Sequence, residues 1–245
     1  MPPRPASPHV TKKNPADACA EEVLRDVPWI AATGEGTLLR LAAASKLRRY
    51  GAGEPVQHRD ASADHVLVVA AGRLEISVTN VEGRRLIVAY LGPGRVSSLV
   101  PVIDGRPSTY TATAHDDETA VLLIPREVFL ATMRDEPALA QGVIAHLCRR
   151  ARNAYNFLAD SSLLPSQQRI ARLLLSLHRA SAGRVRGSAG FSVDLSQESL
   201  AGMLSVSRQR LNLELKALER EGVLRLAYAR IDVIDAPALA RIAGE

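Results

Sequence analysis

The sequence has few cysteines and no long apolar run, and each shortage excludes a class of protein. Two cysteines, Cys19 and Cys148, are too few for a disulfide framework and indicate a reducing compartment. No apolar run approaches the roughly 18–20 residues of a membrane span, and no apolar segment typical of a secretory signal follows Met1. We therefore expect a cytoplasmic protein with no membrane partner.

The motifs of common catalytic chemistry are also absent. The chain has no Gly-x-Ser-x-Gly elbow, no P-loop and no Cys-x-x-Cys pair. Small β-barrel enzymes of the cupin kind often carry a His-x-His pair with a Glu, and no such pair is present. The sequence therefore predicts a protein that is not an enzyme, and a cupin-like ligand-binding protein is an alternative to the function developed below.

The net charge of +5 is distributed unevenly along the chain. Residues 164–245 hold 12 lysines and arginines against 8 acidic residues, a net charge of +4, whereas residues 1–163 have a net charge of +1. The C-terminal third would therefore attract an anionic partner such as DNA. Only 4 of the 31 basic residues are lysines, so a single arginine indicates little about function.

Residues 195–224 contain the clearest pattern, two helices joined by a very short turn. Ser196 and Ser207 are suitable N-caps for the first and second helix, and the first is expected over Gln197–Leu204. Apolar residues recur at helical spacing on the buried faces of the two helices, at Leu200, Met203, Leu204, Leu211, Leu215 and Leu218. The pattern predicts a helix–turn–helix unit.

The outer face of the second helix carries side chains suited to a DNA major groove. The residues predicted to contact DNA are Ser207, Arg208, Gln209, Arg210, Asn212, Leu213 and Lys216. Arginine pairs with guanine and glutamine or asparagine with adenine, whereas Ser207 and Arg210 are expected to hold phosphates. Leu213 is expected to contact a thymine methyl group. A helical hairpin that only mediates protein contacts is the alternative, and salt-dependent DNA binding separates the two.

Two short strands are expected after this helix pair. Glu221-Gly222 supplies a glycine at the C′ position, and residues 223–226 and 230–234 alternate as strands do. The stretch VSRQRLNLELKALEREGVLRLAYARIDVID resembles the winged-helix DNA-binding end of the cyclic-AMP receptor and fumarate–nitrate regulator (Crp/Fnr) family. Where this family commonly has Glu, the chain has Gln209, so the resemblance implies an altered half-site.

The first half of the chain is dominated by short strands between glycine turns. The expected strands are 66–69, 73–78, 85–90 and 120–124, and helices are expected at 21–29, 37–47 and 126–133. Strands at intervals of about ten residues predict a small antiparallel barrel or sandwich. The stretch ADHVLVVAAGRLEISVTNVEGRRLIVAYLGPG resembles the centre of the family's β-roll. The fold class is α+β, with a cyclic-nucleotide-binding-like β-roll, a long dimerisation helix and a C-terminal winged helix-turn-helix.

A long helix is expected after Pro137, and its apolar residues follow a heptad pattern. Steps of four and three residues connect Ala140, Ile144, Leu147, Ala151, Ala154, Leu158 and Ser161. The resembling family places its dimer helix here, which implies a homodimer. The alternative is a helix packed on its own barrel.

The interruption at Leu164-Pro165-Ser166 predicts a hinge, after which a helix is expected over 167–177. The Gly/Ser/Arg-rich segment 182–190 is expected to be a linker, followed by a short strand at 191–193. The predicted segments are a disordered tail (1–20), a β-roll sensor domain (21–136), a dimerisation helix (137–163) and a DNA-binding domain (164–245).

The resemblance also identifies an effector region. In family members that bind cyclic nucleotides, a Gly-Glu-Leu segment holds the ribose hydroxyls and a later Arg-Ser pair neutralises the phosphate. The corresponding positions for effector binding in this chain are Ser97, Ser98, Arg106, Ser108 and Thr109. Ser97-Ser98-Leu99 replaces Gly-Glu-Leu, so the glutamate is missing, and Pro107 has no backbone N–H to donate. We therefore expect that the protein does not use cyclic AMP in the usual way.

Metal-based sensing is the remaining question. An iron–sulfur cluster needs about four cysteines, which excludes it here. The six histidines show no metal-ligand spacing, so no metal site is predicted. A regulator that senses haem or another small ligand stays an alternative, with Pro2, His115 or His146 as axial-ligand candidates. The sequence thus predicts a homodimeric transcription regulator on a two-fold symmetric operator of double-stranded DNA, with RNA polymerase and a small-molecule effector as further partners.

Overall fold

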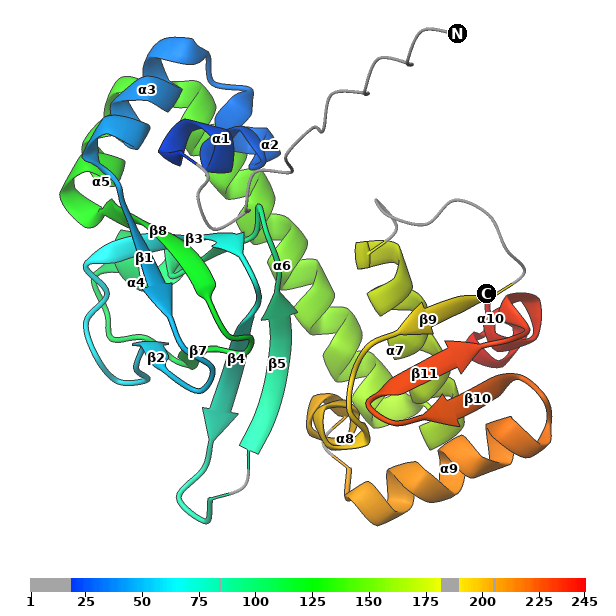
Figure 1. Cartoon of the computed structure of the whole chain (residues 1–245). Coiled ribbons are helices and arrows are strands. Elements are labelled where there is room, and N and C mark those ends of the chain that lie inside the picture. Colours follow the sequence, from blue (N-terminus) through cyan, green and yellow to red (C-terminus); the bar gives the residue numbers. More distant parts are fainter. Residues whose placement is uncertain (1–18, 84, 182–189, 205) are drawn as a thin grey trace, which may run out of the picture. The chain divides into compact units, whose positions relative to one another are not determined.

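The computed structural model describes residues 19–83, 85–181, 190–204 and 206–245 (Figure 1). The predicted tail and linker, and Pro2 with them, fall almost wholly outside these residues. The described residues form two compact units, one within the ranges 19–76 and 90–145 and the other within 77–89 and 146–245. None of the described helices has the combination of length and hydropathy that a membrane span requires.

The first unit begins with three helices, α1 (Ala20–Arg25), α2 (Pro28–Ala31) and α3 (Glu35–Ala44). The prediction of one helix over 21–29 was wrong, because Pro28 at N1 of α2 holds Val27 in an extended conformation that ends the preceding turn. The prediction of a helix continuing to Leu47 was also wrong. Tertiary pairing overrides helix propensity there, since Lys46–Tyr50 forms strand β1 against β8.

Eight strands of the first half form two four-stranded sheets. The first has the order β1-β8-β3-β6, from Lys46–Tyr50, Thr119–Pro125, His65–Ala71 and Val96–Ser97. The second has the order β2-β7-β4-β5, from Pro55–Gln57, Thr111–Ala114, Leu74–Thr79 and Arg85–Leu91. The four predicted strands are β3, β4, β5 and β8, and each agrees within two residues at either end. The short strands β1, β2, β6 and β7 were not predicted.

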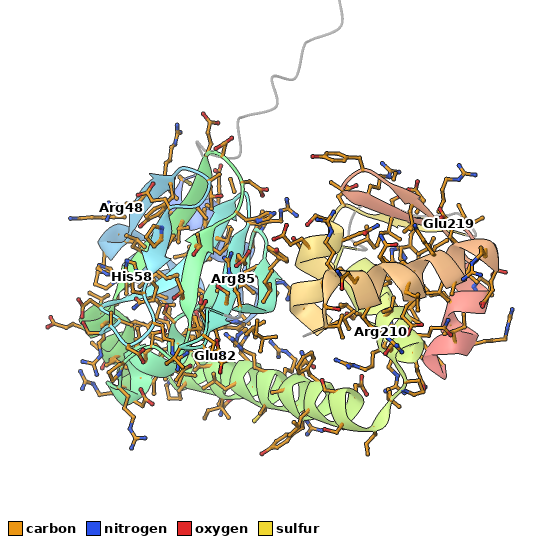
Figure 2. The ribbon with its side chains drawn as sticks, turned by 90° about the horizontal axis from the view of Figure 1, so that it is seen from below. Arg48, His58, Glu82, Arg85, Arg210 and Glu219 are labelled. Carbon is orange, nitrogen blue, oxygen red and sulfur yellow. The ribbon has the colours of Figure 1, made fainter. Side chains whose placement is uncertain are left out.

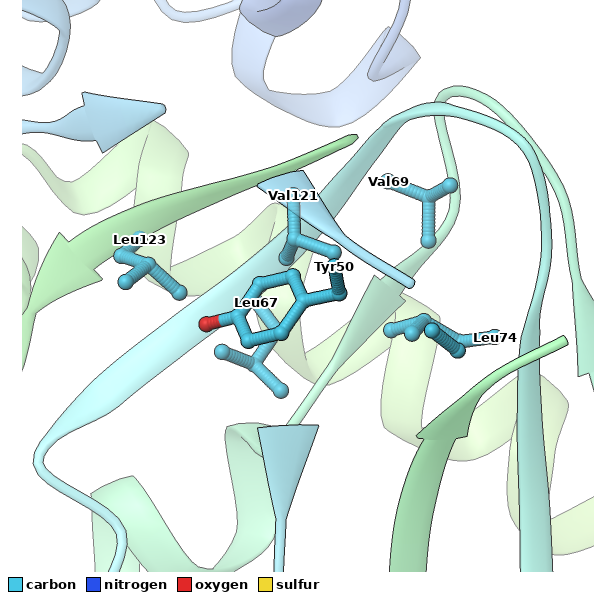
Figure 3. Close-up of a cluster of buried hydrophobic side chains, with 7 residues drawn as sticks. Tyr50, Leu67, Val69, Leu74, Val121 and Leu123 are labelled. Atoms are coloured by element: carbon cyan, nitrogen blue, oxygen red, sulfur yellow. The ribbon is translucent and has the colours of Figure 1, made fainter. Parts of the chain in front are cut away.

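The hydrophobic core of this unit lies between the two sheets. It combines side chains of both, namely Tyr50, Leu67, Val69, Leu74, Ala114, Val121 and Leu123, and Figure 3 shows the Tyr50 ring beside Val121 and Leu67. Arg48 in β1, Arg85 in β5 and Glu82 in the turn between β4 and β5 are exposed (Figure 2). The prediction of an antiparallel sandwich or barrel is confirmed.

Helices α5 (Arg126–Asp135) and α6 (Pro137–Leu163) follow the sheets. The start of α6 packs on the N-terminal helices, where Leu139 and Val143 are buried. Gly142 permits this approach, since a Cβ at that position would lie 2.9 Å from the Cβ of Trp29. From Ala151 to Ala159 every residue of α6 is exposed.

The second unit contains a winged helix. Its elements are α7 (Ser166–Ser181), β9 (Phe191–Val193), α8 (Gln197–Leu204), α9 (Arg208–Arg220), β10 (Leu224–Ala227), β11 (Arg230–Val233) and α10 (Ala236–Ala243). The three strands form one sheet in the order β10-β11-β9. Helix α10 was not predicted, and α7 holds it: Arg172 Nε donates to the carbonyl of Ala243 at 2.9 Å, and Arg179 forms an ion pair with Glu245.

Candidate DNA-recognition surface and effector region

Two serines set the start of α8 and α9. The hydroxyl of Ser196 accepts the N–H of Ser199 at 3.0 Å, and that of Ser207 accepts the N–H of Arg210 at 3.2 Å. Each bond satisfies a first-turn donor that the helix itself leaves without a partner. Both caps and the predicted bounds of the first helix are confirmed.

The inner face of α9 is buried along its length. Leu211, Leu215 and Leu218 are fully buried, as predicted, and Gly222 with φ +73° follows the helix at the predicted C′ position. Sequence reasoning missed Glu214, which is also buried. Its position between Leu211 and Leu218 on the buried face was the signal that was available.

Four of the predicted DNA-contacting residues line one open hollow at the N-terminal end of α9. The hollow has a volume of about 530 Å³ and is lined by Ser207, Arg208, Gln209 and Asn212. Arg208 and Gln209 are exposed and Asn212 is half-buried. Leu213 and Lys216 lie outside this group and are exposed further along the helix.

Arg210 has a different environment from the one expected for a phosphate-binding residue. Its guanidinium forms an ion pair with Glu214 at 2.8 Å, one helical turn on. Both residues line a small cavity of about 10 Å³, room for one water, together with Arg169 of α7. Arg169 donates to the carbonyl of Leu204 at 2.5 Å. The phosphate role of Arg210 stays a prediction, and the structure adds a competing internal carboxylate.

The hairpin β10–β11 extends from the end of α9. Glu219, labelled in Figure 2, accepts the backbone N–H of Leu226 at 2.8 Å and so ties the hairpin to the helix. At the start of β11, Arg230 Nε donates to Asp232 at 2.7 Å. Hydrogen bonds from Ser192 and Arg230 lower the pKa of Asp232 from its ordinary value. At the turn of the hairpin, Tyr228 is fully exposed.

In the effector region, three of the five predicted residues form hydrogen bonds with Tyr110. The Tyr110 hydroxyl lies 2.9 Å from the hydroxyl of Ser97 and accepts the backbone N–H of Ser98 at 2.9 Å. Ser108 donates its hydroxyl to the carbonyl of Tyr110 at 2.9 Å. The Ser98 hydroxyl is buried without a hydrogen-bond partner, and Ser98 has φ +62°. Tyr110 was not singled out from the sequence, although it lies two residues after Ser108.

The other two predicted effector residues lie apart from this cluster. Arg106 and Thr109 are both exposed, and the backbone N–H of Arg106 donates to Asp104 at 3.0 Å. The structure therefore does not bring a guanidinium of the predicted set to the buried serines.

A second polar cluster lies on the β4–β5 side of the same sheets. Arg73 donates two hydrogen bonds to Asp116, at 2.9 and 2.6 Å, and these bonds hold the pKa of that carboxyl below its ordinary value. The Tyr90 hydroxyl donates to the buried Glu75 at 3.3 Å. The ring of His115, a haem-ligand candidate from the sequence, packs edge-on against Tyr90 with centroids 4.7 Å apart. Among the described residues, no cluster of His, Cys, Asp and Glu has the composition of a metal site.

The predicted seam on α6 forms an exposed apolar stripe. Ile144 and Leu158 are 60% and 63% exposed, Ala151 and Ala154 are exposed, and Leu147 is half-buried. Tyr155 and Phe157, which the seam did not include, are exposed on either side of it. A helix with this much apolar surface exposed in one chain has the character of an interface.

Comparisons with known proteins agree with this architecture. Residues 47–136 match the family described as cyclic nucleotide-binding domain, and residues 168–242 match the Crp-like helix-turn-helix domain. The chain is 30% identical to the cyclic AMP receptor protein of Thermus thermophilus, over 80% of this chain and 87% of that protein. It is 29% identical to the HTH-type transcriptional regulator Cmr of Mycobacterium tuberculosis, over 88% of this chain and 87% of that protein.

A solved structure shows the same fold. FixK2 from Bradyrhizobium japonicum superposes with a TM-score of 0.71 at 21% identity, covering 81% of this chain and 96% of that one. The β-sheet domain, the helix–turn–helix with its capped second helix, and the family matches over both parts lead to one conclusion. The chain is a DNA-binding transcription regulator of the Crp/Fnr family.

Proposed function

We propose that the protein acts as a homodimer in the cytoplasm, and that two copies of α9 bind the two halves of a symmetric operator. The observation that carries this proposal is the hollow at the start of α9, where Arg208, Gln209 and Asn212 present groups that pair with base edges. Two-fold pairing through the apolar stripe of α6 would place the helices on half-sites about 34 Å apart, one turn of DNA.

We assign a separate role to each of the four segments predicted from the sequence. Residues 21–136 sense a signal, residues 137–163 dimerise and residues 164–245 bind DNA, with 1–20 as a tail. The protein changes transcription through RNA polymerase and has no catalytic activity of its own. This division is supported by the placement of the exposed apolar residues on α6 and of the predicted DNA-contacting residues on α9.

Selection of genomic DNA fragments by the purified protein tests the proposal. We expect a two-fold symmetric motif, recovered with and without cyclic AMP. Increasing salt should weaken operator binding steeply, because contacts between basic side chains and phosphates release counterions. Failure to recover any motif, together with salt-independent binding to random duplex, would contradict the assignment of α9.

We also propose that the sensor domain does not bind a cyclic nucleotide in the usual way and responds to another signal. The place where the family has a glutamate for the ribose holds Ser98, whose N–H is already bonded to the Tyr110 hydroxyl. Arg106, which would neutralise the phosphate, is exposed instead of facing the serines. The predicted set therefore offers no carboxylate to the ribose of a nucleotide.

Calorimetric titration with cyclic AMP is the direct measurement. We expect no micromolar binding by this protein, because Ser98 replaces the glutamate that holds the ribose and Arg106 is exposed. The cyclic AMP receptor protein of Thermus thermophilus is the matched positive control. Micromolar binding by this chain would show that the Tyr110 cluster opens to admit the nucleotide and would overturn this part of the proposal.

A further inference from the structure

Among the described residues of the α9 hollow, Asn212 forms a side-chain hydrogen bond to the other helix of the pair. Its Nδ2 donates to the Oε1 of Gln197, the first residue of α8, at 3.0 Å. The two residues are 15 positions apart, so the bond joins two separate helices. Asn212 is half-buried, whereas Arg208 and Gln209 in the same hollow are exposed. Its side chain is thus held by a neighbour, not only by its own helix.

The position of Gln197 is fixed because helix α8 is capped at its N-terminus and packed one turn further on. Ser196 caps the first turn of α8 through Ser199, and Leu200 one turn on is fully buried. The turn to α9 is closed by the N–H of Val206, which donates to the carbonyl of buried Ala201 at 3.1 Å. The first residue of α8 therefore holds a constant position relative to α9, and its amide can act as a fixed acceptor.

The bond to Gln197 decides which groups Asn212 can still offer to DNA. An asparagine amide has two N–H donors and one carbonyl acceptor. With one N–H given to Gln197, there remain the Oδ1 acceptor and one N–H. This acceptor–donor pair matches the N6 amino group and N7 of adenine, whereas guanine presents two acceptors, O6 and N7, in the major groove.

From this geometry we infer that Asn212 reads adenine, and that Gln197 is a positioning residue which fixes the orientation of the Asn212 amide. The inference rests on the proposed function, since it requires that α9 enters the major groove. It adds a residue of the first helix to the determinants of sequence preference. Without the Gln197 acceptor, the Asn212 amide can rotate and exchange its donor and acceptor positions, so discrimination at that base falls.

Two substitutions of Gln197 test whether its acceptor oxygen is required or only a side chain of its size. Gln197→Met keeps the length of the side chain and removes the acceptor. Gln197→Glu keeps the acceptor oxygens and removes the donors. Asn212→Ala identifies the base position concerned. The readout is the operator motif selected from random DNA by the full-length protein, because a purely structural role of Gln197 would change affinity for all sequences alike.

For the native protein we expect an adenine preference of about 5- to 150-fold at one position of each half-site, the range for a bidentate pair. Asn212→Ala should abolish it, and Gln197→Met should reduce it at least about fivefold at that position alone. Gln197→Glu should retain the preference while lowering affinity for every sequence, because its charge repels phosphates. The inference is overturned if Gln197→Met keeps the preference, if Gln197→Glu loses it, or if Asn212→Ala changes no position. A native protein that selects no motif would instead count against the proposed function.

Discussion

The Arg208→Ala variant is expected to lose about 1–3 kcal/mol of operator affinity at each half-site, and one base position should lose its guanine preference. Arg208 is the first residue of α9, is exposed, and lines the hollow with Ser207 and Gln209. Within the described part of the chain no ion pair holds its guanidinium, in contrast to Arg210, which is paired with Glu214. Its five N–H donors are therefore suited to bidentate contact with O6 and N7 of guanine. Motif selection together with binding isotherms on the wild-type operator measures both effects.

Arg220→Ala is the matched control for this variant. Arg220 lies at the opposite end of α9 and is exposed, and its Nε donates to the carbonyl of Lys216 at 3.2 Å. The substitution removes the same charge from the same helix but leaves the hollow unchanged. It should weaken binding slightly and equally for all sequences, as loss of a distant charge does. If Arg208→Ala selects the same motif as the native protein, α9 is docked differently from our proposal.

The DNA-binding half was the part of the fold most accessible from sequence. Helices α8 and α9 could be placed because their buried leucines repeat at helical spacing, and because serines cap both. These are local signals, so the sequence contains them directly. Glu214 was missed because a charged residue on a buried face contradicts the hydrophobic pattern, and its burial depends on its ion pair with Arg210.

The sensor half was predicted in outline and less well in detail. Strands β3 and β8 were found because their apolar runs are long, whereas β1 was missed and its first two residues were assigned to the preceding helix. Lys46–Tyr50 contains charged residues and becomes a strand only through pairing with β8, a partner about 70 residues further along the chain. Pairing over such a distance leaves no periodic signal in a short segment.

Prediction of the effector region was limited in a similar way, because its contacts depend on the fold of a loop. Ser97, Ser98 and Ser108 could be chosen by comparison with a family pattern, but the side chain that satisfies them could not. Tyr110 lies two residues beyond Ser108 and reaches back to the start of α4 (Leu99–Asp104), where it bonds Ser97 and Ser98. Only the fold of the loop between α4 and β7 brings the phenol to those serines. Arg106 and Thr109 belong to the same stretch and are nevertheless exposed.

Dimer formation through α6 leads to the other large expected effect. Leu158→Glu should convert the protein from a dimer into a monomer of 26.4 kDa. Leu158 is 63% exposed in the single chain, so the new charge is not buried in the chain itself and each unit should still fold. In the proposed dimer the same position faces its counterpart, and two carboxylates would be brought together in an apolar seam. Sedimentation analysis at micromolar concentration measures the change in mass.

Operator binding should fail together with dimerisation. A monomer engages one half-site, and loss of the linked second site lowers overall affinity by about 10²- to 10⁴-fold without removing any contact within a half-site. Asn156→Glu is the matched control, because Asn156 is exposed on the same turn of α6 and lies off the seam. It adds the same negative charge and should leave both mass and affinity nearly unchanged. A Leu158→Glu protein that remains a dimer and binds its operator normally would show that another surface joins the two copies, since an unpaired carboxylate in the apolar seam could not be accommodated at so small a cost.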